Sequence, residues 1–405
     1  MIKKNLFYKN YIQKKYLNNN SLKKLSKEFK KIIFNINHDI ENTKKTLNVL
    51  NEKFKFNFKI KDLKKFKKFK TIAVIGMGGS ILGAEAIHGF LKMKIKKKIY
   101  FFDNLDNEKI LDFKKNEIVK KTLFLIISKS GSTVETLSNL LSLNIIKKNK
   151  KNIILISERK ENILFAISQK FNLFFIEHKS HLGGRYSVLS EVGVIPAYLM
   201  DLNIFKLRKN LKKYLIKEEK KYLKNSVIKM ANILQQHNYK NLILLNYSPK
   251  LEKFLYWCQQ LIAESLGKKG KGFFPIISKA PKDHHSLLQL YLDGPPDKLF
   301  YIFSYETNLK DKINIKKSIK MNNFLDQKTL SEVKSAQKNA LIKAFIKNNI
   351  QFREFKIKRI NEEALSELFS YFILETIIIG KMIKVNPFDQ PAVEQIKVFT
   401  RNLLS

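Results

Sequence analysis

The amino-acid sequence predicts an α/β protein with two tandem domains, each built around a parallel β-sheet. Short apolar runs of strand length recur along the 405-residue chain, and segments of helical character separate them. The runs are continuous rather than alternating, which is typical of strands in a parallel sheet that helices cover on both faces. The pattern occurs twice, on either side of a long stretch rich in Lys and Glu. A chain of this length can form two domains with substantial cores.

The first part of the chain is expected to hold an arm and one complete domain. Residues 1–65 are rich in lysine and carry Leu, Ile and Phe at mixed spacings, so we predict an N-terminal helical arm. The first α/β domain should cover residues 66–204. Helices are expected over about 81–93 and after Thr133. Its strands are predicted at residues 71–75, 99–102, 122–127, 152–157 and 173–176.

The second part of the chain repeats this alternation. A linking helix is predicted over residues 205–238, and a second domain that ends in a C-terminal helix over residues 239–405. Ligands of such folds bind at the carboxyl ends of the strands, at a switch point or between domains. The strands of the second domain are predicted at residues 241–245, 273–277, 299–303 and 351–355.

The charge of the chain is extreme, at a formal +43 from 78 Lys and Arg against 35 Asp and Glu. A nucleic-acid-binding protein is one interpretation. We favour a compositional bias toward Lys, Asn, Ile and Phe, because the lysines are spread along the whole chain and arginine, the usual reader of base edges, is scarce. No helix-turn-helix, RRM or zinc-finger spacing occurs. We therefore expect no specific nucleic-acid partner, although the field should attract anionic substrates.

Cysteine usage and hydropathy indicate a cytoplasmic protein without a membrane partner. Cys258 is the only cysteine, which excludes an intramolecular disulfide and fits a reducing compartment. No apolar run reaches the roughly 20 residues that a membrane-spanning helix needs. The N-terminus has lysines but no apolar core or small-residue cleavage site after them, so we expect no signal peptide.

Residues 128–136, Ser-Lys-Ser-Gly-Ser-Thr-Val-Glu-Thr, follow a predicted strand and open a predicted helix. Free backbone N–H groups and the helix dipole favour an anion at such a position. Four of the first six residues have hydroxyl groups, and Lys129 adds a full positive charge. A Ser/Thr-rich helix cap is the alternative interpretation. The density of donors after a buried strand favours a phosphate-binding loop.

Two further segments follow predicted strands: one is a glycine-rich turn and the other is a turn that carries an arginine. Gly76-Met77-Gly78-Gly79-Ser80-Ile81-Leu82-Gly83 matches neither the dinucleotide-binding pattern nor the Walker loop, because Ile81 and Ala84 occupy the positions of an essential Gly and Lys. We therefore predict neither NAD nor ATP. Its glycines either allow close approach to a ligand or form a tight turn. Arg185, in Gly183-Gly184-Arg185-Tyr186-Ser187, could stabilise negative charge developing on oxygen, and a salt-bridge residue is the alternative interpretation.

Glu264 lies in an apolar helical run, four residues after Gln260 and on the same helix face. Burial of a carboxylate is costly without a partner or a function, so Glu264 is either a structural ion-pair residue or an acid/base group. A histidine soon after it, together with the phosphate-type loop, indicates proton transfer on a phosphorylated substrate.

The adjacent His284 and His285 have diverging side chains and cannot easily share one metal, and no other cluster has metal-ligand spacing, so no metal is expected. In Asn386-Pro387-Phe388-Asp389-Gln390-Pro391, Asp389 is predicted to cap the C-terminal helix. Gln390 and Lys397 are seven residues apart and should share one helix face.

Six segments together resemble the glucose-6-phosphate isomerase family, and they occur in the order of that family over about residues 71–400. The resemblance implies two sugar isomerase (SIS) domains, each a three-layer α/β/α sandwich, in the short bacterial form of a homodimer without a cofactor. The segments are Gly-Met-Gly-Gly-Ser, Ser-Lys-Ser-Gly-Ser-Thr-Val-Glu-Thr, Gly-Gly-Arg-Tyr-Ser, Gln-Gln-Leu-Ile-Ala-Glu-Ser-Leu-Gly-Lys, Asp-His-His-Ser-Leu-Leu-Gln-Leu and Asn-Pro-Phe-Asp-Gln-Pro-Ala-Val-Glu-Gln-Ile-Lys.

The resemblance also implies roles for individual residues in the interconversion of glucose 6-phosphate and fructose 6-phosphate through a cis-enediol(ate). The base that moves a proton between C2 and C1 falls on Glu264, and the ring-opening histidine falls on His285 of the partner subunit. Lys397 falls on the lysine that assists at the ring oxygen, and Arg185 on the arginine that faces the enediolate. Phosphate contacts fall on Ser128, Lys129, Ser130, Thr133 and Thr136. Other substrate contacts fall on Gly79, Ser80, Gly184, Gln260 and Gln390.

Alternatives to this activity remain open from the residues themselves. A related SIS-domain isomerase could also accept mannose 6-phosphate. A non-catalytic sugar-phosphate sensor could keep the phosphate loop, but it would not need Glu264, His285 and Lys397 together.

Overall fold

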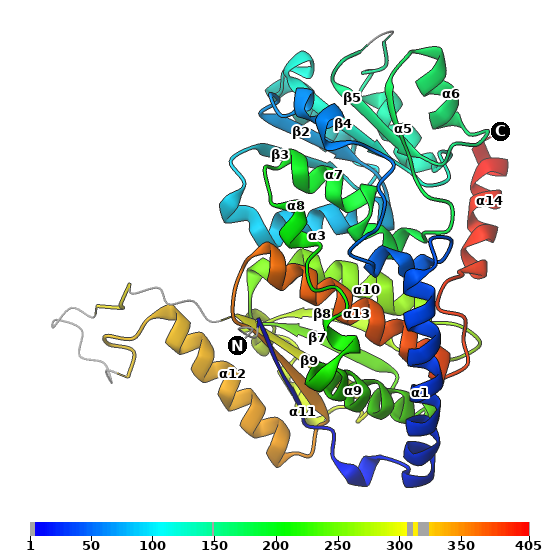
Figure 1. Cartoon of the computed structure of the whole chain (residues 1–405). Coiled ribbons are helices and arrows are strands. Elements are labelled where there is room, and N and C mark those ends of the chain that lie inside the picture. The colour runs from blue at the N-terminus through cyan, green and yellow to red at the C-terminus, as the bar shows by residue number, and fades with distance from the viewer. Residues whose placement is uncertain (1–4, 148–149, 306–310, 315–323, 405) are drawn as a thin grey trace.

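The computed structural model describes residues 5–147, 150–305, 311–314 and 324–404. Two five-stranded sheets form the centres of two domains, which stand one above the other in Figure 1. Helices flank both sheets, so the predicted α/β fold with two sheet domains is confirmed. No helix in the described ranges is both long and apolar enough to cross a membrane.

The first sheet is entirely parallel, with the strand order β3-β2-β4-β5-β6. Its side chains alternate between two separate cores, with Ile72 and Val74 in one and Ala73 and Ile75 in the other. Apolar helices therefore cover both faces. The strands are β2 Thr71–Ile75, β3 Lys98–Phe102, β4 Thr122–Ile127, β5 Ile153–Ser157 and β6 Phe174–Glu177. The helices are α3 Leu82–Leu91, α4 Asn107–Asn116, α5 Val134–Ser142, α6 Ile163–Lys170 and α7 Glu191–Leu199.

The second sheet has the order β1-β10-β9-β7-β8. Strands β7 to β10 are parallel, as predicted. These strands are β7 Asn241–Asn246, β8 Phe274–Lys279, β9 Lys298–Tyr305 and β10 Phe352–Ile357. The helices of this part of the chain are α10 Glu252–Leu266, α11 Leu288–Asp293, α12 Leu330–Lys347, α13 Glu362–Met382 and α14 Glu394–Leu404.

The prediction of a wholly helical N-terminal arm is wrong at its start. Residues Leu6–Asn10 form strand β1, which pairs antiparallel with β10, so the second sheet is mixed rather than parallel. The strand covers an edge of β10 that would otherwise present unpaired backbone groups. The rest of the arm contains helices α1 Asn19–Glu41 and α2 Ile60–Leu63, and α1 packs against α9 (Lys217–Gln236) and α13.

The predicted continuous helix over residues 205–238 is also wrong. The structure has a short helix, α8 Ile204–Leu207, and a long one, α9 Lys217–Gln236. Between them Asn210 adopts a positive φ of 60°, which a helix does not tolerate. The buried Arg208 holds this break in place, because its guanidinium donates to the backbone carbonyls of Val49, Leu189 and Asn51.

Helices α3 and α10 pack against each other and join the two domains. Lys253 of α10 forms a 2.7 Å ion pair with the buried Glu85 of α3. The indole of Trp257 donates to the carbonyl oxygen of Arg185 at 3.2 Å. These contacts place α10, which carries Gln260 and Glu264, next to the loops of the first domain.

The second domain is held by a buried ion pair between Arg353 of β10 and Glu375 of α13, with 2.7 Å between Nη2 and Oε1. The phenol of Tyr371 and the hydroxyl of Ser226 also bond to this pair. A buried pair avoids a large desolvation cost only when hydrogen bonds accompany it, and here Glu375 Oε1 also accepts from Ser226 and Tyr371.

Candidate active site

The candidate site lies at the carboxyl edge of the first sheet, where α10 of the second domain approaches it. The glycine turn 76–80 follows β2, the hydroxyl-rich loop 128–133 follows β4, and the turn 183–185 comes after β6. The carboxyl ends of parallel strands meet at one edge of a sheet, so segments far apart in the sequence come together there.

Arg185 is the centre of this arrangement. Its side chain is 1% exposed, and all five N–H donors of the guanidinium are used. The acceptors belong to α10 and to residues 387–390, which precede the last helix. They are Ser265 Oγ (2.8 Å from Nε), Glu264 Oε2 (3.0 Å from Nη1), the side-chain oxygen of Gln390, and the carbonyl oxygens of Pro387 (2.7 Å) and Asp389 (3.0 Å).

The Glu264 carboxylate is held from two sides. One oxygen accepts from Arg185, and the other accepts from Gln260 Nε2 at 2.9 Å along the same helix face. The side chain keeps 28% of its exposure, so it is fixed but still accessible. The Gln260 carbonyl oxygen is buried and has no hydrogen-bond partner among the described residues. The amide can therefore reorient without breaking a contact at that atom.

The two glycine turns touch through backbone alone. A Cβ atom added to Gly79 would lie 2.2 Å from the carbonyl carbon of Gly184, so a side chain would force the turns apart. Gly78 has a φ of +51°, and a Cβ there would lie 2.8 Å from Gln260 Nε2. The half-buried Ser80 ends this turn. The glycines are needed for close approach of backbone to backbone and to Gln260.

The hydroxyl groups of the 128–136 loop face one another. Ser128 Oγ and Thr133 Oγ1 are 2.9 Å apart, and Ser130 Oγ lies 3.4 Å from the same threonine. Thr136 stands in the first turn of α5, with its Oγ1 buried and without a hydrogen-bond partner in the described chain. Donors clustered at a helix start, one of them unsatisfied, suit an anion.

Lys129 is turned away from these hydroxyls. Its ammonium donates to the carbonyl oxygen of Ser180 at 2.6 Å and lies 3.6 Å from Glu158. Burial lowers the pKa of this ammonium below its ordinary value, and the Glu158 carboxylate offsets part of that effect. In this structure Lys129 supplies its backbone and a nearby charge to the loop, rather than a direct side-chain donor.

Two predicted residues do not join Glu264 within one chain. His285 ends the short 3₁₀ helix Lys282–His285, where its ring is exposed and has no hydrogen-bond partner in the described residues, whereas His284 bonds to Tyr247 at 2.7 Å. Lys397 is exposed on α14 and pairs with Glu394 at 2.7 Å. In Figure 1, α14 runs along the side of the molecule, and no residue of α14 lines the cavity that Glu264 lines.

A family model described as phosphoglucose isomerase matches residues 20–405. The chain belongs to this family. A probable glucose-6-phosphate isomerase of Methanococcus maripaludis is 32% identical over 375 residues, which cover 89% of this chain and 84% of that relative. A glucose-6-phosphate isomerase of Campylobacter jejuni is 29% identical over 89% of this chain and 90% of its own length.

Solved structures show the same fold. A crystal structure of a glucose-6-phosphate isomerase from Chlamydia trachomatis superposes with a TM-score of 0.79 at 15% identity, over 99% of this chain and 88% of that chain. The predicted membership of the phosphoglucose isomerase family is thus confirmed. The roles of single residues stay predictions.

The sequence analysis missed several residues that shape the candidate site of this member of the phosphoglucose isomerase family. Tyr186 bonds to Ser265 Oγ and to the Pro387 carbonyl, both at 2.7 Å. Lys268 bonds to the Asn386 carbonyl and pairs with Asp389 at 2.7 Å. Asp389 is therefore an ion-pair partner and not the predicted helix cap; Gln390 precedes the 3₁₀ turn Pro391–Val393.

Lys268, Glu264 and Gln390 line one cavity of about 550 Å³ between the end of α10 and residues 385–393. A sequence signal existed, because Tyr186, Ser265 and Lys268 all lie within segments that resemble the family, but residue type and spacing did not single them out. In the described part of the chain no group of three or more His, Cys, Asp or Glu is placed to hold a metal.

Proposed function

We propose that this member of the phosphoglucose isomerase family interconverts D-glucose 6-phosphate and D-fructose 6-phosphate, a step of glycolysis and gluconeogenesis. The observation that carries the proposal is the Glu264 carboxylate, which Arg185 and Gln260 orient on the wall of a cavity. The relatives from M. maripaludis and C. jejuni bear the name of this activity, the former as probable.

The 128–136 loop would hold the phosphate of the substrate. The hydroxyls of Ser128, Ser130 and Thr133, the free Thr136 hydroxyl and the backbone N–H groups at the start of α5 supply the donors. Glycine turns 76–80 and 183–185 would bring backbone close to the sugar. Binding energy from the remote phosphate then positions C1 and C2 against Glu264.

Glu264 would carry the proton of the isomerisation. In the open-chain aldose its carboxylate removes the proton from C2. The electron pair of that C–H bond forms the C1–C2 double bond, and the carbonyl oxygen on C1 becomes the enediolate oxygen. The proton of the C2 hydroxyl passes to the oxygen on C1, the glutamic acid returns its own proton to C1, and the C2 oxygen becomes the ketone. A side chain held at both oxygens needs little reorganisation for these two transfers.

Arg185 would stabilise the negative charge of the enediolate through its own charge together with a hydrogen bond from Nη1. All five of its donors are used in the structure, so a hydrogen bond to the intermediate requires Nη1 to exchange Glu264 or Gln390 for the sugar oxygen. Because Glu264 loses its charge when it takes the proton, its hold on Nη1 weakens at the step where the enediolate forms.

Ring opening would need His285 and Lys397, and we propose a homodimer in which His285 reaches the site of the partner chain. Support comes from the exposure of the His285 ring and from an apolar surface on the last helix. Large exposed apolar side chains in one helix favour a protein partner. They are Ile396, Val398, Phe399, Leu403 and Leu404.

Complementation between inactive variants tests this sharing of residues. Glu264→Gln and His285→Ala should each be nearly inactive alone. After random re-association at equal amounts, about a quarter of all sites should regain both residues, because a symmetric dimer exchanges its halves. Isomerase activity of the mixture is the measurement.

The matched control is a mixture of Glu264→Gln with Arg185→Lys, whose altered residues belong to one chain and should not restore each other. Equal recovery in both mixtures, or no recovery with His285→Ala, would contradict a shared site.

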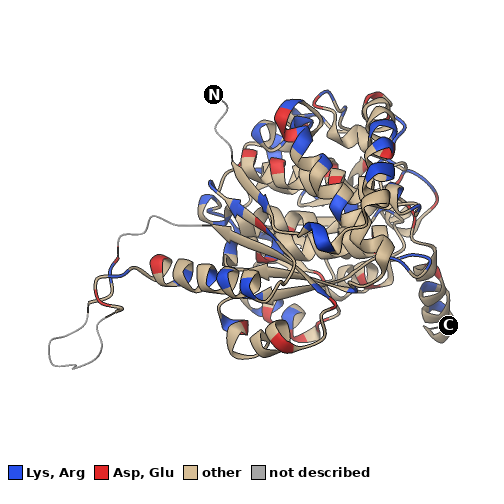
Figure 2. Cartoon of the chain, turned by 90° about the horizontal axis from the view of Figure 1, so that it is seen from below, with Lys and Arg blue, Asp and Glu red and all other residues tan. Residues whose placement is uncertain are grey.

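The proposed ligand is a small sugar phosphate, and we expect neither a specific nucleic acid nor a membrane as partner. Basic side chains are spread over the elements of both domains rather than gathered in one stripe (Figure 2). We also place the protein in the cytoplasm, which the buried free thiol of Cys258 suits.

A coupled assay on fructose 6-phosphate with EDTA present tests the function itself. The purified chain should form glucose 6-phosphate at an undiminished rate when divalent cations are chelated, because Glu264 performs the proton transfer. No turnover, or turnover only after a metal is added back, would refute the proposal.

Thr136→Val is expected to lower kcat/KM by about tenfold, since a hydrogen bond to a charged group contributes about 1.5–3 kcal/mol. Its Tm should hardly change, because the hydroxyl has no partner to lose in the free protein. Thr122→Val is the reciprocal control: that hydroxyl donates to the Ile118 carbonyl far from the loop, so stability should fall while kcat/KM stays. An unchanged kcat/KM for Thr136→Val would remove this residue from the phosphate site.

A further inference from the structure

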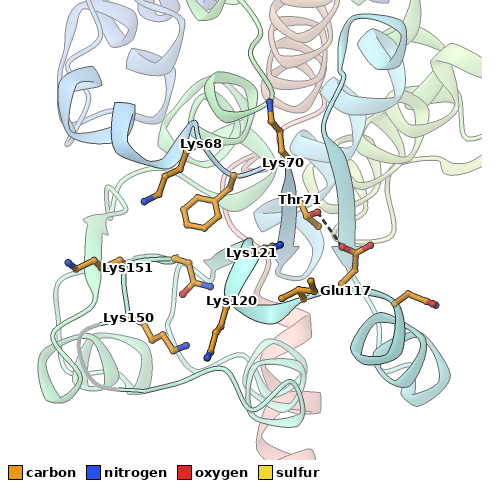
Figure 3. A pocket seen from close by; sticks show the side chains of 12 residues that line it. Lys68, Lys70, Thr71, Glu117, Lys120, Lys121, Lys150 and Lys151 are labelled. Atoms are coloured by element: carbon orange, nitrogen blue, oxygen red, sulfur yellow. Dashed lines mark hydrogen bonds between the residues drawn. The ribbon is translucent and has the colours of Figure 1, made fainter.

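A second cavity lies at the opposite edge of the first sheet, at the amino ends of β2, β4 and β5 (Figure 3). Its volume of about 690 Å³ is in the range of small-molecule sites. Three segments form it: residues 68–71, 116–121 and 150–152. Because the candidate active site is at the carboxyl edge, a ligand here would not be the substrate in its reacting position.

The lining of this cavity is unusually basic even for this chain. Six of its twelve lining residues are lysines, whereas Lys and Arg together make up only 78 of the 405 residues. None of the six has an ion-pair partner among the described residues, so their charges are not neutralised by the fold. They are Lys68, Lys70, Lys120, Lys121, Lys150 and Lys151.

The other polar groups of the lining are already occupied. Glu117, the one carboxylate, accepts from Lys98, from Tyr100 and from Thr71, and the last of these bonds is drawn in Figure 3. The Asn152 amide donates to two backbone carbonyls. The end of α4 adds only about half a negative charge. The groups left for a ligand are therefore the lysine ammonium groups, of which those of Lys70 and Lys151 extend away from the middle of the cavity in Figure 3.

We propose that this lysine pocket binds a small linear polyphosphate, such as the triphosphate group of a nucleotide or free tripolyphosphate. Several ammonium groups on flexible stems act as point charges for phosphate, whereas the planar fork of arginine, which suits a single carboxylate or phosphate, is absent from the lining. A chain of linked phosphates presents enough charge to reach lysines from all three segments at once. The proposal does not depend on the isomerase reaction.

Calorimetric titration of the whole chain with tripolyphosphate at physiological salt tests the site. We expect one saturable site per chain, with inorganic phosphate binding much more weakly. The variant Lys120→Gln/Lys121→Gln/Lys150→Gln should bind tripolyphosphate at least about tenfold more weakly, because half of the attracting charges are gone. Its isomerase activity should stay unchanged.

The control variant Lys23→Gln/Lys24→Gln/Lys27→Gln removes the same charge from exposed positions on α1 and should bind within about twofold of the unaltered chain. Equal weakening in both variants, or many weak sites, would show diffuse attraction by the +43 chain and overturn the proposal.

A further variant separates this pocket from the phosphate loop. Tripolyphosphate binding that is lost in Ser128→Ala but kept in the pocket variant would place the anion at the 128–136 loop and overturn the proposal. ATP and tripolyphosphate should both bind. Equal affinity shows recognition of the phosphates alone, and tighter binding of ATP shows an added contact of the nucleoside with the pocket, whose apolar lining includes Phe69 and Ile118.

Discussion

Glu264→Gln is expected to lower kcat by at least about a hundredfold, the low end of what general acid–base groups contribute. An amide cannot take up the C2 proton, so the enediolate cannot form by this route. Binding of a phosphorylated substrate analogue should persist, because the 128–136 loop is unaltered. Steady-state kinetics in both directions, with analogue affinity measured separately, distinguishes the two effects.

The hydrogen bonds around Glu264 can be kept when the residue becomes glutamine, so the substitution should remove the proton acceptor without disturbing the fold. The remaining oxygen of the new amide can still accept from Arg185. Gln260 can turn its own amide to accept from the new NH2 group, since its carbonyl oxygen has no partner to lose among the described residues. The variant should therefore fold normally, and lost activity would report chemistry.

Glu191→Gln is the matched control for that experiment. Glu191 is likewise a helical glutamate, although fully buried, and it accepts from the backbone N–H of Asn57 at 2.8 Å, away from the candidate site. Its burial raises the pKa of the carboxyl, so an uncharged replacement costs little there. Near-normal turnover of Glu264→Gln, or an equal loss in both variants, would remove Glu264 from its proposed role.

Arg185→Lys is expected to lower kcat by about 10²–10³-fold, as the loss of a transition-state donor does elsewhere. It should also lower the free energy of unfolding by about 2–4 kcal/mol, because a lysine has three donors and cannot span the five acceptors. The carbonyl oxygens of Pro387 and Asp389 and the Ser265 hydroxyl would lose their partner. Denaturant unfolding and kinetics on the folded fraction measure the two effects separately.

Arg208→Lys provides the comparison for Arg185→Lys. Arg208 is likewise a buried arginine that donates to backbone carbonyls, but its acceptors lie in the segments 49–51 and 189. It should destabilise the protein and leave kcat of the folded fraction intact. If both variants lost stability alone, Arg185 would be a structural residue and not part of the reaction.

Much of the fold could be predicted from the sequence because its signals are local. A strand buried on both faces is a nearly continuous apolar run, so runs such as 122–127 and 241–245 predict strands from the sequence alone. Strand β1 could not be found this way. Leu6–Asn10 is short and partly polar, and only the exposed edge of β10, more than 340 residues later, makes it a strand. The break after α8 likewise depends on carbonyls that Arg208 reaches in other segments.

The candidate site divides in the same way. Motifs with unusual residue types, such as the hydroxyl-rich loop and the glycine turns, determine locally where an anion or a close backbone approach is possible. The family membership followed from these motifs and their order, and it is confirmed by the match over residues 20–405.

What only the tertiary structure decided is which side chains meet. Arg185, Glu264 and Gln390 are far apart in the chain, yet one guanidinium binds both side chains. The fold also turned Lys129 toward Ser180, left His285 and Lys397 exposed, and gathered six lysines at the far edge of the sheet. The physical reason is that residue type and spacing set what a segment can bind or bury, whereas its partners are set by packing between segments, which local sequence does not encode.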